Sequence, residues 1–373
     1  MMQPRHTSKR AAGFSLVELI LALALGLVVV TGIVQLFVGN SQTYAVLNGQ
    51  ARMQENARFA MEFISRAARS AGYFGCAPER PNIVRGLMGT WDTIPEFDIT
   101  RMVQGYEGGG GGWSPAITSV PRTVGGTNTN VYIPGNGINT NVIVPGTDVL
   151  VFRSKQLPGQ RLVETLQPDG NPVVTAPGGN PGFGVGDIVM VADCEQGAVF
   201  RVTAMTVNGN EATLRYDTFG GGLYDNGAII ESPTGSVPFT LSYLGRSYGP
   251  DTTVAALQST YFFVAPGAGV DNQLNPVPSL WQKLGSAAPV ELVQGVEDLQ
   301  VLYGIDTTLN DRVANANQYV TFNNLPNPND PDNVVSVRVS LTVNSIDAVT
   351  DDGQVLRRTF SKTILLRNAD PEV

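Results

Sequence analysis

The chain has 373 residues, enough for one large β-rich domain or two small ones, and its 24 Lys and Arg face 32 Asp and Glu, a net charge of −8. This acidic balance gives no electrostatic footprint for nucleic acid, so we expect no nucleic-acid partner. Hydrophobic residues make up 42% of the chain, which argues against disorder, while 42 Gly and 24 Pro predict many short strands joined by long polar loops.

An apolar segment from Leu19 to Val38 dominates the N-terminal region. Its twenty residues contain two polar side chains and no charge, so as a helix the segment is long enough to span the ~30 Å hydrocarbon layer of a membrane. Three basic residues lie in the first ten positions, and no charged residue lies between Glu18 and Arg52. The N-terminus is therefore expected on the cytoplasmic side, with the rest of the chain across the membrane.

Glu18 is the unusual residue of this region. A carboxylate in an apolar helix costs about 2.5 to 3.5 kcal/mol at the bilayer centre and less near an end, so its presence indicates a function. In the first turn of a helix the macrodipole favours an anion, and an amine four residues earlier could pair with it. A carboxylate that reaches the cytoplasmic headgroups is the alternative.

A short basic leader ending in Gly13, then Phe14, and Glu18 four residues later resembles the type III signal of prepilins, which build type IV pili and type II secretion pseudopili. The resemblance implies that prepilin peptidase cuts after Gly13, that Phe14 is N-methylated, and that Glu18 acts in filament assembly. An ordinary secretory signal fits less well, because the apolar stretch is too long and no Ala-x-Ala site follows it. An uncleaved anchor would leave these three residues unexplained.

No proline lies between Phe14 and Pro78, so one helix is predicted to run to about Gly72. Its outer half is amphipathic, with an apolar stripe expected to pack on a globular head. A free-standing coiled coil is the alternative, but the stripe lasts barely three heptads. The stripe consists of Met53, Ala57, Ala60, Ile64, Ala67 and Ala71.

Residues 77–147 are predicted to form loops, including the glycine run 108–112, which lacks the Lys-Ser/Thr of a phosphate-binding loop. The strongest hairpin signal is Asn208-Gly209, between a predicted strand 199–207 and its partner 212–216. Strict alternation predicts a strand over 335–343 with one solvated face, whereas 289–297 is predicted as one or two helical turns. Further strands are predicted at 149–152, 188–191, 261–264, 280–284, 299–305 and 360–366.

The segment from Glu291 to Gly304, the 335–344 strand and the terminal run 365–368 are similar to PilW-type minor pilins and the related J-type minor pseudopilins. The 72–76 junction is similar to theirs too. The resemblance implies an α+β, pilin-like fold: a long N-terminal helix packed on a mostly antiparallel β-sheet head with long loops. Gln35 stands where many major pilins carry a kinking proline, and the C-terminal disulfide loop is missing, so a major subunit is disfavoured.

Cys76 and Cys194 are the only cysteines. In the periplasm a lone pair is expected to form a disulfide, which would contribute about 4 to 5 kcal/mol by restricting the unfolded chain. Two unpaired thiols are the alternative.

Catalysis is poorly supported, because the only histidine, His6, lies in the predicted leader. No cofactor and no metal site are expected. Two acidic loops, one with Asp330 and Asp332 and the other with Asp347, Asp351 and Asp352, do not match a calcium-loop spacing and are interpreted as solvated turns.

The sequence thus predicts a leader at residues 1–13, a membrane-spanning part of the helix at 14–38, its amphipathic periplasmic half at 39–76 and a β-rich periplasmic head at 77–373. We expect a minor pilin, a structural subunit and not an enzyme, that helps prime type IV pilus assembly and lies at the filament tip. Its expected partners are other minor pilins, the major pilin, prepilin peptidase and the inner-membrane assembly platform. A type II secretion minor pseudopilin and a pilus-associated adhesin are the alternatives.

Overall fold

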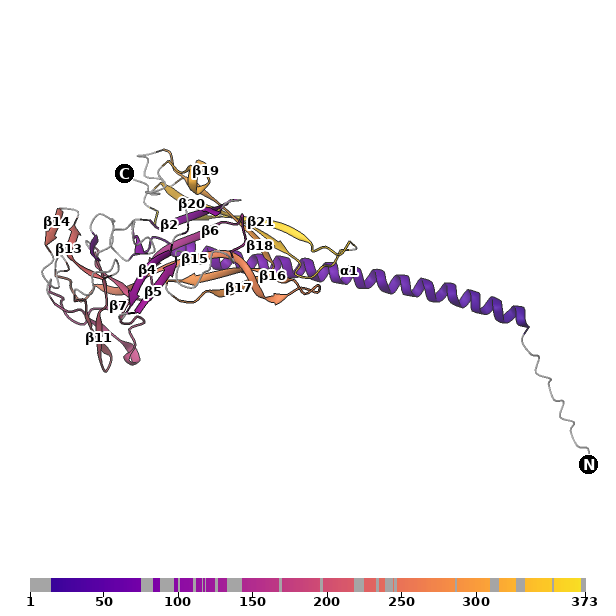
Figure 1. The fold of residues 1–373 in the computed structure, drawn as a ribbon, viewed down its shortest axis with the longest axis horizontal. Coiled ribbons are helices and arrows are strands. Elements are labelled where there is room, and N and C mark those ends of the chain that lie inside the picture. The colour runs from indigo at the N-terminus through magenta and orange to yellow at the C-terminus, as the bar shows by residue number, and fades with distance from the viewer. Residues whose placement is uncertain are drawn as a thin grey trace, which may run out of the picture.

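In the computed structural model, the described residues form one long helix and a β-rich head (Figure 1). The structure describes residues 15–74, 83–87, 97–99, 101–109, 112–115, 117, 119–124, 127–132, 143–167, 170–194, 197–217, 225–232, 235–238, 244, 247–285, 287–308, 315–326, 333–350 and 352–369. Helix α1 runs from Leu16 to Ser70, and Ala71 leaves the helical conformation. The predicted unbroken helix is confirmed, with its end two residues earlier than expected.

The head contains four sheets among the described residues, and its strand pairs are antiparallel except for the parallel pair β1–β10. The largest sheet has the order β14-β13-β1-β10-β9-β15-β6-β2-β3, with β7, β16 and β17 attached through β15 and β16. These strands are β1 (Ile83–Leu87), β2 (Val103–Gly109), β3 (Gly112–Ser114), β6 (Val149–Lys155), β7 (Gln160–Arg161), β9 (Ile188–Ala192), β10 (Gly197–Arg201), β13 (Asn226–Ser232), β14 (Gly235–Pro238), β15 (Thr253–Val270), β16 (Pro276–Leu284) and β17 (Val290–Gln294).

Three smaller sheets complete the head. The C-terminal sheet has the order β19-β18-β20-β21, and the others are β11-β12-β8 and the pair β4-β5. Among the described residues, two short 3-10 turns, η4 (Pro177–Gly179) and η5 (Phe322–Asn324), lie in the connections. The strands are β4 (Ser119–Val124), β5 (Thr127–Tyr132), β8 (Val173–Thr175), β11 (Ala204–Asn208), β12 (Glu211–Arg215), β18 (Val296–Ile305), β19 (Gln318–Val320), β20 (Val334–Asn344) and β21 (Arg357–Leu365).

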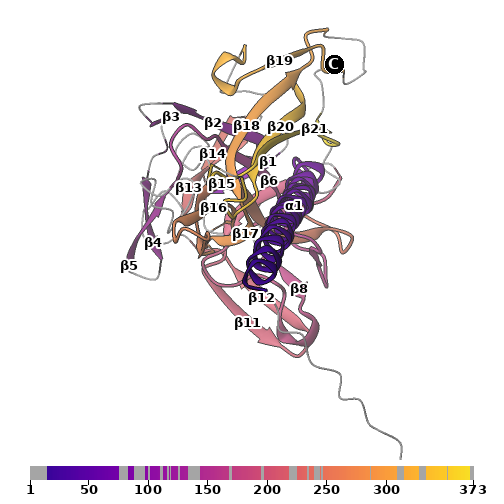
Figure 2. The ribbon, with the colours of Figure 1, turned by 90° about the vertical axis from the view of Figure 1, so that its right-hand side faces the viewer.

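The outer half of α1 packs on β20, β21, β17 and β6, as Figure 2 shows in the view toward the helix. The predicted stripe is buried except for Ala67, which is half-buried, while its neighbour Ala68 is fully buried. The stripe shares one core with alternating residues of β18 and β20, including Leu299 and Leu341. Docking of the helix on its own head is confirmed, because the apolar face covers the period-two face of the C-terminal sheet.

Polar contacts fix the register of this docking. The Asn56 side-chain amide donates to the Gln294 carbonyl at 3.0 Å, and the Asn368 amide donates to the Ala71 carbonyl at 2.8 Å. Gly49 lets the helix approach the turn after β20, since a Cβ there would lie 3.0 Å from the Ser345 Cβ. The helix is therefore held at both ends of its docked half.

The helix predicted at 289–297 is wrong, because this segment forms β17 and the start of β18. Gly295, with φ +80°, separates the two strands, and a Cβ on it would come within 3.0 Å of the Asn344 Oδ1 atom. Leu292, Val293 and Val296 have a spacing that suits a helix equally well. The pairing of β17 with β16 decides the conformation, and it depends on residues distant in the sequence.

Two other predictions need correction. The region 77–147 is not only loop, since β1 to β5 lie in it and Gly109 pairs with Gly112 where β2 meets β3. The predicted strand 199–207 is in fact two strands, β10 and β11. The Val202 N–H donates to the Asp187 backbone carbonyl, whereas the Thr203 N–H donates to the Arg215 backbone carbonyl, in another sheet. The predicted β11–β12 hairpin and the other predicted strands are confirmed.

The N-terminal helix as a candidate assembly site

Glu18 lies in the first turn of α1, with its side chain exposed. Ser15 is the N-cap residue, and its carbonyl accepts the first helical hydrogen bond from the Leu19 N–H at 3.1 Å. An anion in this turn interacts favourably with the unpaired N–H groups and the helix dipole. The predicted cleavage and methylation residues, Gly13 and Phe14, lie outside the described residues.

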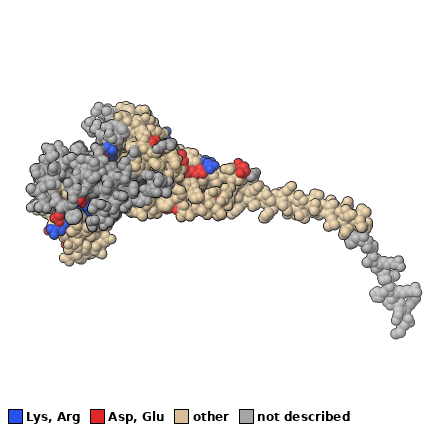
Figure 3. Space-filling model, in the orientation of Figure 1, with Lys and Arg blue, Asp and Glu red and all other residues tan. Residues whose placement is uncertain are grey.

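The inner half of α1 projects from the head without touching it. Every residue from Leu16 to Tyr44 is exposed, with Leu16 at 74% and Phe37 at 73%. On the face drawn in Figure 3, the projecting part consists almost entirely of uncharged residues. By length and composition the helix could cross a membrane. Such a surface is far larger than the apolar patches of soluble monomers, so it needs a lipid or protein cover.

A groove beside the docked half of α1 is a feature that the sequence analysis missed. It has a volume of about 530 Å³ and lies between the helix and the edge strand β17. Phe59, 44% exposed, and Phe63 line its helix side, and Leu292 and Ile346 line the opposite side. The groove joins residues more than 200 positions apart, so no local sequence signal could have revealed it.

Charge near the groove comes from Arg52. Its Nη1 atom lies 4.0 Å from the Asp347 Oδ2 atom, with both side chains about half exposed. An exposed pair at this distance adds little stability. The Arg52–Asp347 pair therefore contributes little to the docking of the helix.

Two carboxylates, Glu107 and Asp148, link the largest sheet to η5 and to the C-terminal sheet. Glu107 accepts a 2.6 Å hydrogen bond from the Phe322 N–H, and Asp148 accepts from the N–H groups of Gly108 and Val301 at 2.9 Å each. Burial raises the pKa of Glu107 to about 7, opposed by the Phe322 bond and helped by the charge of Asp148. Burial also raises the pKa of Asp148. These carboxylates hold backbone segments together, and neither of them lines the groove beside α1.

The structure describes only some of the remaining residues that the sequence analysis singled out. Cys194 follows β9, and no described cysteine is a free thiol, but Cys76 lies outside the described residues, so their pairing stays a prediction. Asp330, Asp332 and Asp351 also lie outside them. Asp347 accepts from the Asn272 N–H, and Asp352 accepts from the Thr350 hydroxyl. No group of three metal-ligating residues was found in the described part of the chain.

The architecture defines a class: a long apolar N-terminal helix followed by a mostly antiparallel β-sheet domain is an α+β, pilin-like fold. Residues 8–34 match the family model described as the prokaryotic N-terminal methylation motif. Residues 261–354, from β15 to the turn after β20, match the model described as type IV pilus-assembly protein W. The predicted resemblance to PilW-type minor pilins is confirmed. No curated protein and no solved structure is significantly similar to the chain.

Proposed function

We propose that the protein is a minor pilin that is made as a prepilin in the inner membrane and incorporated at or near the tip of a type IV pilus, where it helps to prime assembly. Both family matches point to a structural pilus protein rather than an enzyme. The observation that carries the proposal is the exposed apolar half of α1, with Glu18 at its end. Nothing in the described head covers this surface.

The physical role of Glu18 follows from its position. Cleavage after Gly13 would leave a cationic amine on Phe14, one helical turn from the Glu18 carboxylate. Inside an apolar environment, a carboxylate without a partner is costly. An incoming subunit that places its Glu18 against a neighbour's amine would remove this cost, and the pairing would set the axial register of the two helices.

The groove supports the same function. Phe59 and Phe63 offer an apolar surface beside the helix, with Arg52 at its edge. In the proposed assembly the helix of a neighbouring pilin lies along this groove. The partners are the other minor pilins and the major pilin, after prepilin peptidase and the inner-membrane assembly platform have acted.

The head is proposed to lie in the periplasm before assembly, where a Cys76–Cys194 disulfide could form. A type II secretion pseudopilin is the rival within the same machinery. The PilW match favours the pilus, and the neighbouring genes would provide an inexpensive further test.

Mass spectrometry of sheared filaments tests processing and incorporation together. We expect an N-terminal peptide that begins at Phe14 and carries one added methyl group. A Gly13→Leu variant should keep its leader and stay in the membrane fraction. Filament-derived protein that begins at Met1 or Met2 would contradict the proposed processing.

A further inference from the structure

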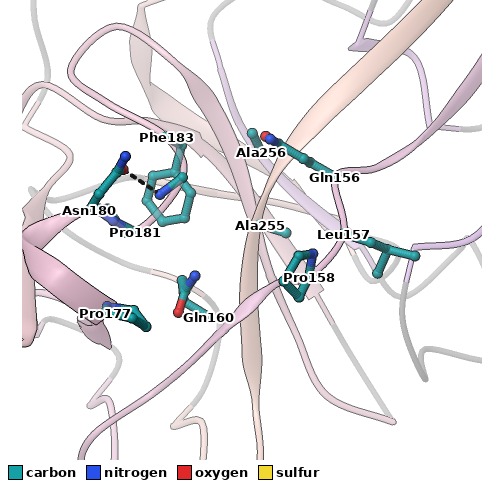
Figure 4. Close-up of a pocket in the computed structure, with 11 residues that line it drawn as sticks. Gln156, Leu157, Pro158, Gln160, Pro177, Asn180, Pro181, Phe183, Ala255 and Ala256 are labelled. Carbon is teal, nitrogen blue, oxygen red and sulfur yellow. Dashed lines mark hydrogen bonds between the residues drawn. The ribbon is translucent and has the colours of Figure 1, made fainter.

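A second pocket lies in the head, beside β7 and β15. Figure 1 shows these strands in the head, away from the projecting half of the helix. Figure 4 shows its two walls: the segment that carries Gln156 and Pro158 on one side, and the loop from Pro177 to Phe183 on the other. Gln160 and Ala255 lie between them. The volume is about 290 Å³. This is near the lower limit of the roughly 300–1,000 Å³ usual for small-molecule pockets, so a compact ligand fits best.

The lining chemistry is neutral and rich in side-chain amides. None of the described lining residues carries a charge, and three of them, Gln156, Gln160 and Asn180, carry amides. The Gln160 Oε1 atom accepts from the Thr175 hydroxyl at 2.8 Å, and the Asn180 Oδ1 atom accepts from the Gly182 N–H at 2.8 Å. These bonds orient the two amides and use only their oxygens, which leaves the NH2 groups to donate to a ligand.

Apolar surfaces flank these amides. Leu157 is 60% exposed, and Pro158 and Pro177 are exposed at the two walls. Exposed aliphatic rings and branched chains beside oriented amides suit a ligand with an apolar C–H face and a rim of hydroxyl groups. A charged ligand would find no counter-charge here, and a purely apolar ligand would leave the amides unpaired, which is costly.

The loop wall of the pocket is preformed in the absence of a ligand. Proline fixes φ at two positions of the loop, Pro177 and Pro181. The Asn210 side chain accepts from the Gly178 N–H at 3.2 Å, and its carbonyl accepts from the Ala176 N–H at 2.6 Å, so the hairpin β11–β12 holds the loop in place. A preformed site loses less conformational freedom on binding.

We propose that this pocket binds a neutral sugar unit, with the amides of Gln156, Gln160 and Asn180 on its hydroxyl groups and Leu157, Pro158 and Pro177 against its C–H surface. A sugar combines hydroxyl donors and acceptors with apolar C–H faces and carries no charge. The assignment goes beyond assembly, because it concerns the purified chain whether or not it enters a filament.

The test uses the purified full-length chain in lipid discs, because detergents with sugar headgroups would compete for the site. The probes are the methyl glycosides of glucose, galactose, mannose and N-acetylglucosamine, titrated with saturation-transfer NMR. We expect at least one glycoside to bind. Gln160→Glu, which keeps the acceptor for Thr175, and Gln156→Ala should each weaken that binding about 2- to 10-fold, the effect of losing one hydrogen bond.

The matched control is Gln167→Glu, an exposed amide of the same region that lies outside the pocket and bonds the Ser247 hydroxyl. It should leave the affinity unchanged. The Gln156 side chain makes no hydrogen bond among the described residues, so its removal should not alter the melting temperature, and this variant decides the result if Gln160→Glu unfolds. Failure of all four glycosides to bind would overturn the proposal. An unchanged glycoside affinity in Gln156→Ala would also overturn it. The same holds if a proline-rich peptide binds the chain and none of the glycosides does.

Discussion

Glu18 is the only charged residue between Ser15 and Ala51. Its proposed effect on assembly can be measured separately from processing of the leader. If its charge pairs with a neighbour's amine, Glu18→Ala should be cleaved normally but enter filaments at least about tenfold less, the effect of losing a pairing of roughly 1.4 kcal/mol or more. Immunoblots of sheared pili and of the membrane fraction measure both quantities.

Glu18→Gln and Glu55→Ala are the matched variants for this experiment. The first keeps the size of the side chain without the charge, so it should fail like the alanine variant. The second removes an exposed carboxylate from the docked half of the same helix, and it should incorporate normally. Normal incorporation of Glu18→Ala would instead favour a carboxylate that merely reaches the headgroups.

Glu107 predicts a dependence of head stability on pH. Its pKa is about 7 in the folded chain, mainly because burial disfavours the charged form, against 4.5 without that environment. The folded state therefore holds the proton more tightly, and the stability that this group contributes is complete below about pH 4.5 and is lost as the pH rises through 7. Unfolding free energy should fall between pH 5 and 8.

Glu107→Gln isolates this contribution, because its side-chain oxygen can still accept from the Phe322 N–H. At pH 8 the variant should be more stable than the wild type by about 1 to 2 kcal/mol, a value reduced for the partial exposure of the group. Denaturant titrations at pH 5, 6, 7 and 8 measure the difference. Parallel pH profiles for the two proteins would assign the dependence to other groups, such as Asp148.

At the scale of elements, buried and exposed positions on α1 should behave differently. Ile64 is fully buried in the core, so Ile64→Ala should lower the unfolding free energy by about 2 to 4 kcal/mol.

Phe59 lines the groove, so Phe59→Ala should lower the unfolding free energy by less than about 1 kcal/mol but reduce filament incorporation. Denaturation and pilus shearing measure the two effects. A Phe59→Ala variant that assembles normally would exclude the groove as a helix-docking surface.

The elements that the sequence predicted correctly are those with a strong local pattern. The proline-free apolar run gave α1, and nine alternating residues gave β20, because one face meets the core and the other meets solvent. The 289–297 segment failed because a short apolar run suits a helix or a strand, and pairing with β16 decides between them. The β1–β5 strands were missed because Gly-rich and polar segments carry little periodicity.

The candidate sites also differ in whether a local sequence pattern indicates them. Glu18 could be proposed as an assembly residue from the sequence alone, because a basic segment, a glycine and a carboxylate lie within a few residues of one another. The groove beside α1 and the pocket beside β7 could not, since each joins segments that only the tertiary fold brings together.

For the whole molecule, the proposed Cys76–Cys194 disulfide would connect the segment after the helix to the C-terminal end of β9, an inner strand of the large sheet. Closing so long a loop restricts the unfolded chain, so Cys194→Ser should lower the unfolding free energy by several kcal/mol, about 4 to 5 in the loop-entropy model. The full-length variant should melt lower and be cut sooner by protease. Thiol labelling of both cysteines in unreduced wild-type protein would show that the bond is absent.

In the proposed assembly, the projecting half of α1 also restricts how a subunit can leave the bilayer. It carries sixteen large apolar side chains, from Leu16 to Val38, that are exposed in the isolated chain. Withdrawing each from a nonpolar environment into water costs about 1.5 to 3 kcal/mol, a total of tens of kcal/mol. Thermal motion does not supply such an energy, so lipid contacts must be exchanged for protein contacts step by step during extraction. In that assembly, departure from the membrane and entry into a filament are one event, and a subunit without a neighbouring subunit stays in the lipid.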